Sequence, residues 1–445
     1  MRRTTGRIVR GLALVSALAL GATACGGSDD DSDTKAVSAG DLQAALDKGG
    51  DITVWAWEPT LKTVAADFQK KYPKVKVNLV SERSGDKHYT ALSNAISAGK
   101  GVPDVAQVEY FALGQYSLTK GLTDLAPYGA DKLASKYTPG PWNAVSDGDK
   151  VYGLPMDSGP MALFYNKTVF DKYKIAVPTT WDEYLDAARK LHKADPKAYI
   201  ANDLGDAGFT TSLLWQAGSR PYKVDGTKVA INFDDAGAKK FETIWQQLID
   251  EKLLAPVSGW TDDWYKGLGD GTIATLATGA WMPANFVTGV PNAKGQWRAA
   301  AMPAWTKGDK ASAENGGSSL AVPALAKNKE LAYAFTEYAN SGAGVATRVS
   351  EGAFPATKAE LESPAFQSKK FDYFDGQEAN KIFAESAANV ASDWSYLPFQ
   401  PYANSIFNDT VGKAYVSSTK LADGLKAWQD ASVKYGEEQG FTVEK

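Results

Sequence analysis

Apolar and polar positions follow two alternating periods in the stretch that begins near residue 50. Residues 51–57 (DITVWAW) are rich in β-branched and aromatic side chains, which predicts a strand, and residues 59–72 carry apolar side chains at helical spacing behind a proline suited to a first turn. Residues 75–80 predict a second strand, residues 89–98 a second helix and residues 104–108 a third strand. This βαβαβ order predicts a parallel sheet with helices on both faces, and therefore an α/β fold.

The ends of the predicted strands carry paired aromatic and acidic residues. In an open α/β sheet, ligands bind outside the carboxyl ends of the strands. The first strand closes with Trp57 and Glu58, and the third is followed by Glu109 and Tyr110. We expect both pairs to lie at a binding site.

The first 24 residues predict an export signal. They contain four arginines and then an apolar run over residues 11–24, which is shorter than the roughly 20 residues that a membrane-spanning helix needs. Residues 1–24 are therefore expected to be a signal peptide and not a permanent anchor.

Cys25 is the only cysteine in the chain. With Ala22, Thr23 and Ala24 before it and two glycines after it, it resembles the lipobox of bacterial lipoproteins, in which the cysteine is lipidated; Ala22 stands where that pattern usually has leucine. The alternative is a free or buried thiol. The segment that follows (GGSDDDSDTKAVS) is small, polar and acidic, so residues 25–39 are expected to form a lipid-anchored flexible linker.

Length and charge limit the classes of function. The roughly 400 residues after the leader exceed what one hydrophobic core usually serves, so two domains are expected. Removing the four leader arginines lowers the formal charge from −4 to −8, which argues against nucleic acid as a partner. The chain has 13 Trp, 20 Tyr and 17 Phe, which either pack in cores or offer flat faces to sugar rings.

An ordered set of short motifs resembles the bacterial extracellular solute-binding proteins of family 1. The motifs cover nearly all of the chain after the leader, and Thr275 is a departure where the family often has methionine. They are residues 151–170 (VYGLPMDSGPMALFYNKTVF), 181–183 (WDE), 269–281 (GDGTIATLATGAW), 315–323 (NGGSSLAVP), 327–341 (KNKELAYAFTEYANS) and 351–356 (EGAFPA).

The resemblance implies a two-lobe, periplasmic-binding-protein-like fold with a hinge and a central ligand cleft. It places residues 40–157 and 305–350 in an N-terminal lobe, and residues 158–304 and 351–445 in a C-terminal lobe. Glycines and prolines at 153, 155, 159 and 160 flank the first crossover and are expected to form a hinge, the alternative being an ordinary loop.

The resemblance also implies a set of ligand-binding residues, since carbohydrate-binding members use aromatic stacking and acidic hydrogen bonding at matching places. Each aromatic has an alternative role in core or hinge packing. Lys87 and Arg83 are expected to donate hydrogen bonds to the hydroxyl groups of the ligand. The predicted ligand-binding residues are Trp57, Glu58, Arg83, Glu109, Tyr110, Asp157, Trp215, Trp281, Asn285, Gly317, Phe354 and Trp394.

Catalytic chemistry has little support in the sequence. His88 and His192 are the only histidines and lack a zinc-binding pattern, and neither a phosphate loop nor a GxSxG nucleophile elbow occurs. Asp262 and Asp263 are the best candidates for a glycosidase carboxylate pair, but adjacent acids at a helix start commonly serve the helix dipole. We expect a protein that is not an enzyme and that needs no metal and no cofactor.

The expected function is that of the extracellular substrate-binding lipoprotein of an ABC importer. Such a protein would be a monomer anchored by lipid at the outer side of the cell membrane, and would capture a sugar, expected to be an oligosaccharide, and deliver it to the membrane permease. The alternatives are a surface-tethered glycosidase and a binding protein for a charged ligand such as a peptide or polyamine.

Overall fold

The computed structural model describes residues 36–81, 85–203 and 205–445, with the side chain of Asp86 left aside. The expected signal peptide, the lipidation site Cys25, most of the expected linker and the predicted ligand residue Arg83 lie outside the described residues. Within the described ranges, none of the helices combines the length and the apolar character that crossing a membrane requires.

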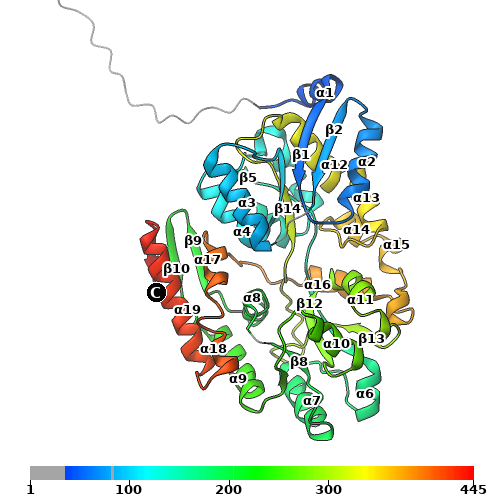
Figure 1. The fold of residues 1–445 in the computed structure, drawn as a ribbon, viewed down its shortest axis with the longest axis vertical. Coiled ribbons are helices and arrows are strands. Elements are labelled where there is room, and N and C mark those ends of the chain that lie inside the picture. Colours follow the sequence, from blue (N-terminus) through cyan, green and yellow to red (C-terminus); the bar gives the residue numbers. More distant parts are fainter. Residues whose placement is uncertain (1–35, 82–84, 204) are drawn as a thin grey trace, which may run out of the picture. The chain divides into compact units, whose positions relative to one another are not determined.

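The first part of the chain builds a five-stranded sheet with the order β2-β1-β3-β14-β6. Strands β1 (Gly50–Trp55), β2 (Val75–Val80) and β3 (Val105–Glu109) are parallel, as the sequence predicts, and helices α2 (Leu61–Lys71) and α3 (Gly85–Ala98) connect them. Strand β14 (Ser318–Ala321) comes from much later in the chain and is antiparallel to both β3 and β6 (Leu154–Pro155). The sheet is therefore mixed, and a distant segment supplies the strand between β3 and β6 (Figure 1).

Helices cover this sheet and enclose a first core around Val54, Phe68, Val108, Leu320 and Phe335. We call the elements around this core the first lobe. They also include α1 (Ala39–Lys48), α4 (Tyr110–Leu118), η1 (Ala126–Tyr128), η2 (Ala130–Lys136), α5 (Pro139–Val145), β4 (Ser146–Asp147), β5 (Lys150–Val151), α12 (Lys329–Asn340) and α13 (Ala343–Ser350).

Helix α1 corrects the expected end of the linker. Ser38 caps the helix, because its hydroxyl accepts a hydrogen bond from the Asp41 backbone N–H (3.2 Å) while the Asp41 carboxylate accepts one from the Ser38 N–H (2.8 Å). The Val37 N–H also donates to the Pro127 carbonyl (2.8 Å). Residues 37–39 are thus part of the folded lobe and not of a flexible spacer.

The later part of the chain is organised around the antiparallel strands β12 (Thr275–Gly279), β7 (Met161–Asn166) and β13 (Trp297–Ala300). Successive side chains of a strand point to opposite faces, so Met161 and Leu163 of β7 join a second core while Ala162 and Phe164 join a third. Because one strand serves both cores, we call the elements around them together the second lobe.

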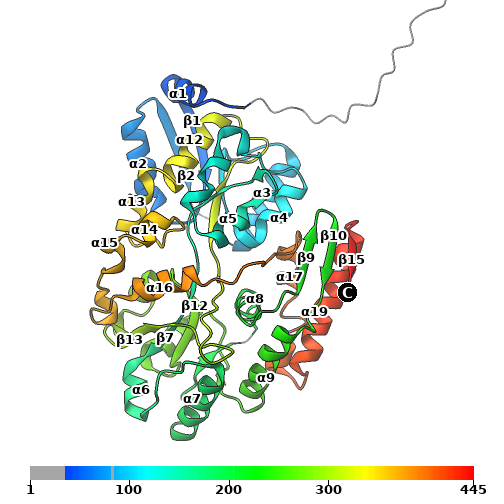
Figure 2. The ribbon, with the colours of Figure 1, turned by 180° about the vertical axis from the view of Figure 1, so that it is seen from behind.

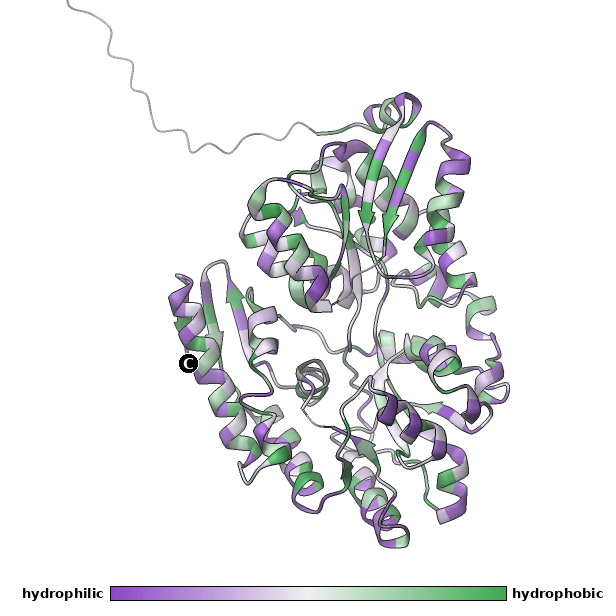
Figure 3. Cartoon of the chain, in the orientation of Figure 1, coloured by the Kyte–Doolittle hydropathy of each residue, from purple (hydrophilic) through white to green (hydrophobic). Residues whose placement is uncertain are grey.

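The second core contains Trp181, Phe241, Trp245 and Trp428, and the third contains Phe286, Trp297, Phe374 and Phe383. Figure 2 shows α7, α9 and α19 on the lower part of the ribbon, and Figure 3 shows polar and apolar residues mixed along these outer helices, as expected of elements with one buried face. The other elements are α6 (Lys167–Tyr173), α7 (Trp181–Ala194), β8 (Ala201–Asn202), α8 (Ala207–Gln216), β9 (Tyr222–Asp225), β10 (Lys228–Ile231), α9 (Ala236–Asp250), β11 (Leu254–Ala255), α10 (Asp262–Asp270), α11 (Met282–Gly289), η3 (Pro291–Ala293), α14 (Lys358–Leu361), α15 (Pro364–Gln367), η4 (Asp372–Phe374), α16 (Ala379–Ala388), α17 (Gln400–Ser405), α18 (Lys413–Val416), α19 (Leu421–Glu438) and β15 (Thr442–Glu444).

The packing moves one expected lobe boundary. Trp305 contacts Trp181 with ring centroids 5.3 Å apart, and Ala313 belongs to the second core. Leu320 is in the first core, so the chain returns to the first lobe after residue 313 and not at residue 305. The expected boundary at residue 305 lies too early in the chain. Residues 305–313 form no helix or strand, so no sequence pattern indicates where the chain re-enters the first lobe.

Three crossing segments run side by side between the lobes: residues 157–160, 314–318 and 353–357. Asp157 forms a β-bridge with Pro355, and Pro160 forms one with Glu314. The Asn315 N–H donates to the Gly159 carbonyl (2.7 Å), and a Cβ on Gly159 would overlap the Asn315 carbonyl oxygen. The close approach of these backbones is therefore the reason for glycine at 159.

Candidate ligand-binding site

A cavity of about 600 Å³, which we call the first cavity, is lined by residues of both lobes. Its volume falls in the range of roughly 300–1,000 Å³ typical of small-molecule sites. Glu109 and Phe111 come from the first lobe. The second lobe and the crossing segment contribute most of the wall, including Asn202, Asp203, Asp206, Phe209, Thr211, Ser212, Trp260, Trp264, Thr278, Trp281, Asn315, Tyr396, Asn404 and Asn408.

Three tryptophans form one wall of the first cavity. Trp260 is 52% exposed and has a positive φ of 65°, and its ring lies 4.9 Å from that of Trp264 and 5.8 Å from that of Trp281. The Trp281 indole N–H donates to the Asn315 carbonyl (2.8 Å), and the Trp264 N–H donates to the Asn202 side-chain oxygen (2.6 Å). These bonds fix two of the rings, and Trp260 presents the largest exposed aromatic surface.

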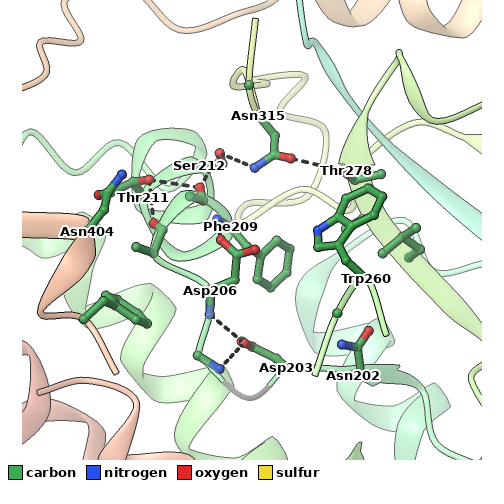
Figure 4. Close-up of a pocket in the computed structure, with 18 of the residues that line it drawn as sticks. Asn202, Asp203, Asp206, Phe209, Thr211, Ser212, Trp260, Thr278, Asn315 and Asn404 are labelled. Atoms are coloured by element: carbon green, nitrogen blue, oxygen red, sulfur yellow. Dashed lines mark hydrogen bonds between the residues drawn. The ribbon is translucent and has the colours of Figure 1, made fainter. Parts of the chain in front are cut away.

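Polar side chains face this wall from the start of helix α8. Asp206 caps the helix, and one of its carboxylate oxygens accepts from the Phe209 N–H (2.9 Å). The Asn315 side chain links the two sides of the cavity, because it donates to the Ser212 hydroxyl (3.2 Å) and accepts from the Thr278 hydroxyl (3.0 Å). Figure 4 shows Asp206, Phe209 and Trp260 directed toward the same space.

Asp203 supports the loop that carries Asp206. Its carboxylate accepts hydrogen bonds from the Trp245 indole N–H (2.8 Å), the Tyr415 hydroxyl (2.8 Å) and the Gly205 backbone N–H (2.8 Å). Burial raises the pKa of Asp203 to about 6. With three donors already bound, Asp203 is a positioning group, whereas the exposed Asp206 carboxylate is available to a ligand.

Glu109 lies at the edge of the first cavity, at the end of β3, as the strand-end argument predicts. Its carboxylate accepts from the Tyr89 hydroxyl (2.8 Å), which in turn accepts from the Glu109 backbone N–H (3.0 Å). Burial, followed by the nearby Glu109 charge, raises the pKa of the Tyr89 hydroxyl well above its ordinary value. Tyr89 therefore remains protonated and holds the Glu109 carboxylate in place.

A second cavity of about 400 Å³ also draws its lining from both lobes. Three predicted ligand residues line it: Tyr110, Trp215 and Trp394. The rings of Trp215 and Trp394 are stacked with centroids 5.0 Å apart and planes 7° apart, and the Trp215 indole N–H donates to the Ala391 carbonyl (2.7 Å). The structure thus divides four of the six predicted aromatic residues between two cavities, with Trp281 in the first.

Trp57 and Glu58 line neither cavity. A Glu58 carboxylate oxygen accepts from the Thr60 hydroxyl (2.6 Å) and the Leu61 N–H (3.2 Å), and lies 3.8 Å from the Arg348 guanidinium. Trp57 packs against the first core and meets the His88 ring edge-on at 5.0 Å. In the described structure Glu58 supports the start of helix α2, because its carboxylate is bonded to the α2 backbone and lies near Arg348, while Trp57 serves the first core.

Four other predicted residues are likewise away from the cavity walls. Phe354 is 4% exposed and packs on Phe366 and Phe383 in the third core, which corrects its expected role as a ligand platform. Gly317 has a φ of +97°, and a Cβ there would lie 2.6 Å from the Tyr110 ring, so close approach to protein and not to ligand requires glycine. The remaining two are Asn285 on α11 and Asp157 in the first crossing segment.

Asp157 and Glu314 form a reciprocal arrangement across two crossing segments. Asp157 accepts from the Ser318 backbone N–H (2.6 Å) and hydroxyl (3.1 Å), while Glu314 accepts from the Ser158 hydroxyl (2.8 Å) and the Gly159 N–H (3.4 Å). Burial raises the pKa of Asp157 to about 6 and that of Glu314 to about 7. Asp157 and Glu314 thus each join two crossing segments, and no sequence pattern indicated the role of Glu314.

Trp260, Asp206 and Phe209 also line the first cavity, and none of the three is predicted from the sequence. One signal for Asp206 was present, since an aspartate before the apolar run of residues 207–215 is typical of a helix cap. Asp262 and Asp263, the candidate carboxylate pair, are exposed in the first turn of α10 and line neither cavity. Across the described ranges, no three His, Cys, Asp or Glu residues are grouped so as to hold a metal ion.

The sequence motifs, the two lobes and the cavities between them define a solute-binding protein. The chain belongs to the family of bacterial extracellular solute-binding proteins, whose model matches residues 55–346. The two-lobe α/β fold expected from the sequence is confirmed by solved structures that are similar over nearly their full length.

Among these structures is the ABC transporter-associated binding protein from B. animalis subsp. lactis Bl-04, in complex with β-1,6-galactobiose. It is 47% identical, with a TM-score of 0.82, and the match covers 89% of this chain and 99% of that one. The galacto-N-biose/lacto-N-biose I-binding protein from Bifidobacterium longum, in complex with lacto-N-biose, is 28% identical with a TM-score of 0.77 and the same coverage of each chain. The arabinooligosaccharide-binding protein of Bacillus subtilis is 29% identical over 65% of this chain and 69% of its own length. All three are binding proteins.

Proposed function

We propose that this protein is the substrate-binding component of an ABC importer and that it captures a neutral oligosaccharide in the first cavity. The observation that carries the proposal is the wall of this cavity, in which exposed aromatic faces lie beside carboxylate and amide groups from both lobes. The β-1,6-galactobiose complex of the relative from B. animalis supports the same ligand class.

The chemistry of the wall favours a neutral polyol. The C–H faces of a sugar ring pack on Trp260 and Trp281, while hydroxyl groups donate to Asp206 and Glu109. Among the described residues that line the first cavity, none is Lys, Arg or His, so an anionic ligand would find no counter-charge there. A ligand that donates hydrogen bonds and carries no negative charge fits this wall best.

A panel of saccharides tests the proposal directly. Thermal-shift measurements would compare β-1,6-galactobiose, lacto-N-biose, lactose and arabino-oligosaccharides with glucuronic acid as an anionic control. A sugar present at 100 times its dissociation constant should stabilise the folded state by about 2.7 kcal/mol. Stabilisation by the anionic sugar alone would contradict the proposal.

Trp281→Ala tests the position of the ligand. Loss of this aromatic face should weaken binding of the sugar identified in the panel by about 1–3 kcal/mol, near the range of buried aromatic hot spots. Trp142→Ala is a matched control, because Trp142 is half-buried against Tyr137 and lines neither cavity. If titration calorimetry gives the same affinity for the Trp281 variant and the wild type, the ligand does not bind against this wall.

We propose that binding closes the lobes around the crossing segments, with the boundaries given above. Contacts from both lobes are satisfied together only in the closed state, and this difference in affinity shifts the population toward it. Solution scattering should show a smaller radius of gyration at saturating sugar. Tight binding without compaction would favour a rigid binding module.

The cellular context is proposed from the leader sequence and the family. We propose that Cys25 is lipidated and holds a monomer at the outer side of the cell membrane, where it delivers sugar to permease subunits. Cys25→Ala should release a folded protein into the medium, as measured by fractionation. Retention of that variant in the membrane fraction would count against lipidation.

A polyamine is the second candidate ligand, because the carboxylates of the first cavity have no described basic neighbours in the lining. Cation binding would weaken as salt is added, whereas binding of a neutral sugar would change little. Titrations of spermidine and of the best sugar at low and high salt separate the two candidates.

A further inference from the structure

The second cavity has the features of a binding site, although the proposed function does not use it. Its volume of about 400 Å³ is within the range of small-molecule sites. Helices α4 and α5 of the first lobe provide one side, and the β9–β10 turn and residues 390–398 provide the other.

Aromatic rings line this cavity on a fixed support. Trp394 is stacked on the buried Trp215, and its own partial exposure leaves surface for a ligand. The loop before it is held by Arg220, which donates to the Ser392 carbonyl (2.6 Å), and by the bond from Trp215 to the Ala391 carbonyl. The Trp394 platform is therefore preorganised.

The polar groups of the second cavity are acceptors and hydroxyls. Asp225 and Asp393 are exposed carboxylates of the second lobe, and Asn143 is an exposed amide on α5 of the first lobe. Of the described residues that line the cavity, none carries a positive charge. An aromatic face beside exposed acceptors suits a neutral ring that bears hydroxyl groups, as in the first cavity.

The two cavities are neighbours in the structure. Tyr396 lines both of them, and consecutive residues of the first lobe divide between them, with Glu109 in the first and Tyr110 in the second. A saccharide chain that leaves the first cavity past Tyr396 would therefore meet the Trp394 platform next.

We propose that the second cavity binds a further pyranose unit of the same oligosaccharide, so that the protein selects ligands longer than a disaccharide. This inference rests on the proposed function. It adds the prediction that chain length, and not only the identity of the first sugar unit, sets the affinity.

Titration calorimetry with β-1,6-linked galacto-oligosaccharides of two, three and four units tests the proposal. For the wild type, we expect the dissociation constant to fall by roughly tenfold between the disaccharide and the longer chains. Asn143→Trp should fill the second cavity from its exposed position on α5. This variant should bind the disaccharide as the wild type does and lose the gain for longer chains.

Asn143→Ala is the matched control, because it changes the same position without adding bulk, and it should keep most of the gain. Asp225→Asn, in the β9–β10 turn, is an independent variant that removes one acceptor charge, and it should lower affinity for the longer chains only. Equal wild-type affinity for all three lengths, or equal affinities of Asn143→Trp and wild type for the tetrasaccharide, would overturn the inference while leaving sugar binding intact. A wild type that binds none of the three would instead contradict the proposed function in its galactoside form, and this inference with it.

Discussion

The crossing segments and the wall of the first cavity both depend on carboxylates, but in opposite ways. Glu314 is buried and Asp157 is half-buried, and hydrogen bonds from the neighbouring segment occupy both carboxylates. Asp206 is exposed and uses one oxygen to cap α8, which leaves the other side of the group to a ligand. The difference shows that an acidic residue in a motif, Asp157, can serve the connection between the lobes, while an exposed carboxylate of the proposed site, Asp206, lies outside the motifs.

The largest effect on stability should come from replacing Arg348, the positively charged side chain next to the crossing segments. Arg348 is 2% exposed, donates to the Met156 carbonyl (2.6 Å) and lies 3.8 Å from the Glu58 carboxylate, and its charge opposes the rise that burial causes in the pKa of Asp157. Arg348→Ala leaves these two half-buried acidic groups without their counter-charge and should lower the free energy of unfolding by about 3–5 kcal/mol. Urea denaturation measures this change.

Arg189→Ala is the control, because Arg189 is an exposed partner of Glu251. Such exposed pairs typically contribute about 0–1 kcal/mol. Similar losses of unfolding free energy in the two variants would show that the ion pair at the crossing segments contributes no more to stability than an exposed one.

Gly159→Ala should have the next largest effect. The added methyl group would overlap the Asn315 carbonyl, and we expect a loss of about 1–3 kcal/mol from overpacking together with weaker ligand binding, because Asn315 lines the first cavity. Gly40→Ala, in the exposed first turn of α1, is the control, since the nearest atom to its added Cβ is 3.5 Å away and Gly40 lines neither cavity. A Gly159 variant with wild-type stability and affinity would show that the segments can separate without cost.

The buried carboxylates should also make stability depend on pH. Because burial raises the pKa of Glu314 to about 7, the folded state favours the protonated form, and the stability that this provides is lost as pH rises from about 4.5 toward 7. Glu314→Gln removes this titration, so its unfolding free energy relative to wild type should increase over that window by on the order of 1–3 kcal/mol. Denaturation series at several pH values measure the difference, and a relative decrease would mean that Glu314 is stabilised in its charged form.

The smallest effect should come from the exposed acids of α10. Asp262→Ala and Asp263→Ala remove charge from the first turn of the helix and should each cost about 0.3–1 kcal/mol. Neither change should alter sugar affinity, and purified protein should leave the bound oligosaccharide intact. Release of monosaccharide by the wild type but not by the variants would restore the glycosidase alternative.

The sequence predicted the fold better than the site. Strand β2 and the parallel order of β1, β2 and β3 follow from short-range periodicity, and the motifs located the crossing segments. The partnership of β14 with β3 could not be predicted from period alone, because it joins residues more than 200 positions apart. The strand-end rule predicted Glu109 near a binding site, whereas Trp281 was predicted only through the family resemblance; both line the first cavity.

Trp260 could not be predicted in the same way. It lies in a turn and has a backbone conformation unusual for tryptophan, and its neighbours Trp264 and Trp281 come from other elements. Glu58 and Phe354 are of the residue types expected at a sugar site. In the structure, however, Glu58 accepts a hydrogen bond at the start of α2 and Phe354 packs in the third core. Residue type restricts what a side chain can bind, whereas tertiary packing decides whether it is exposed.

The late arrival of β14 has a consequence for biosynthesis. This strand lies between β3 and β6, yet it begins roughly 160 residues after β6 ends. At ribosomal rates of about 5–20 residues per second, the central gap in the first sheet stays unfilled for roughly 8–30 seconds while the second lobe emerges. Until residues 318–321 are available, the edge of β3 that β14 covers has no strand to pair with on that side.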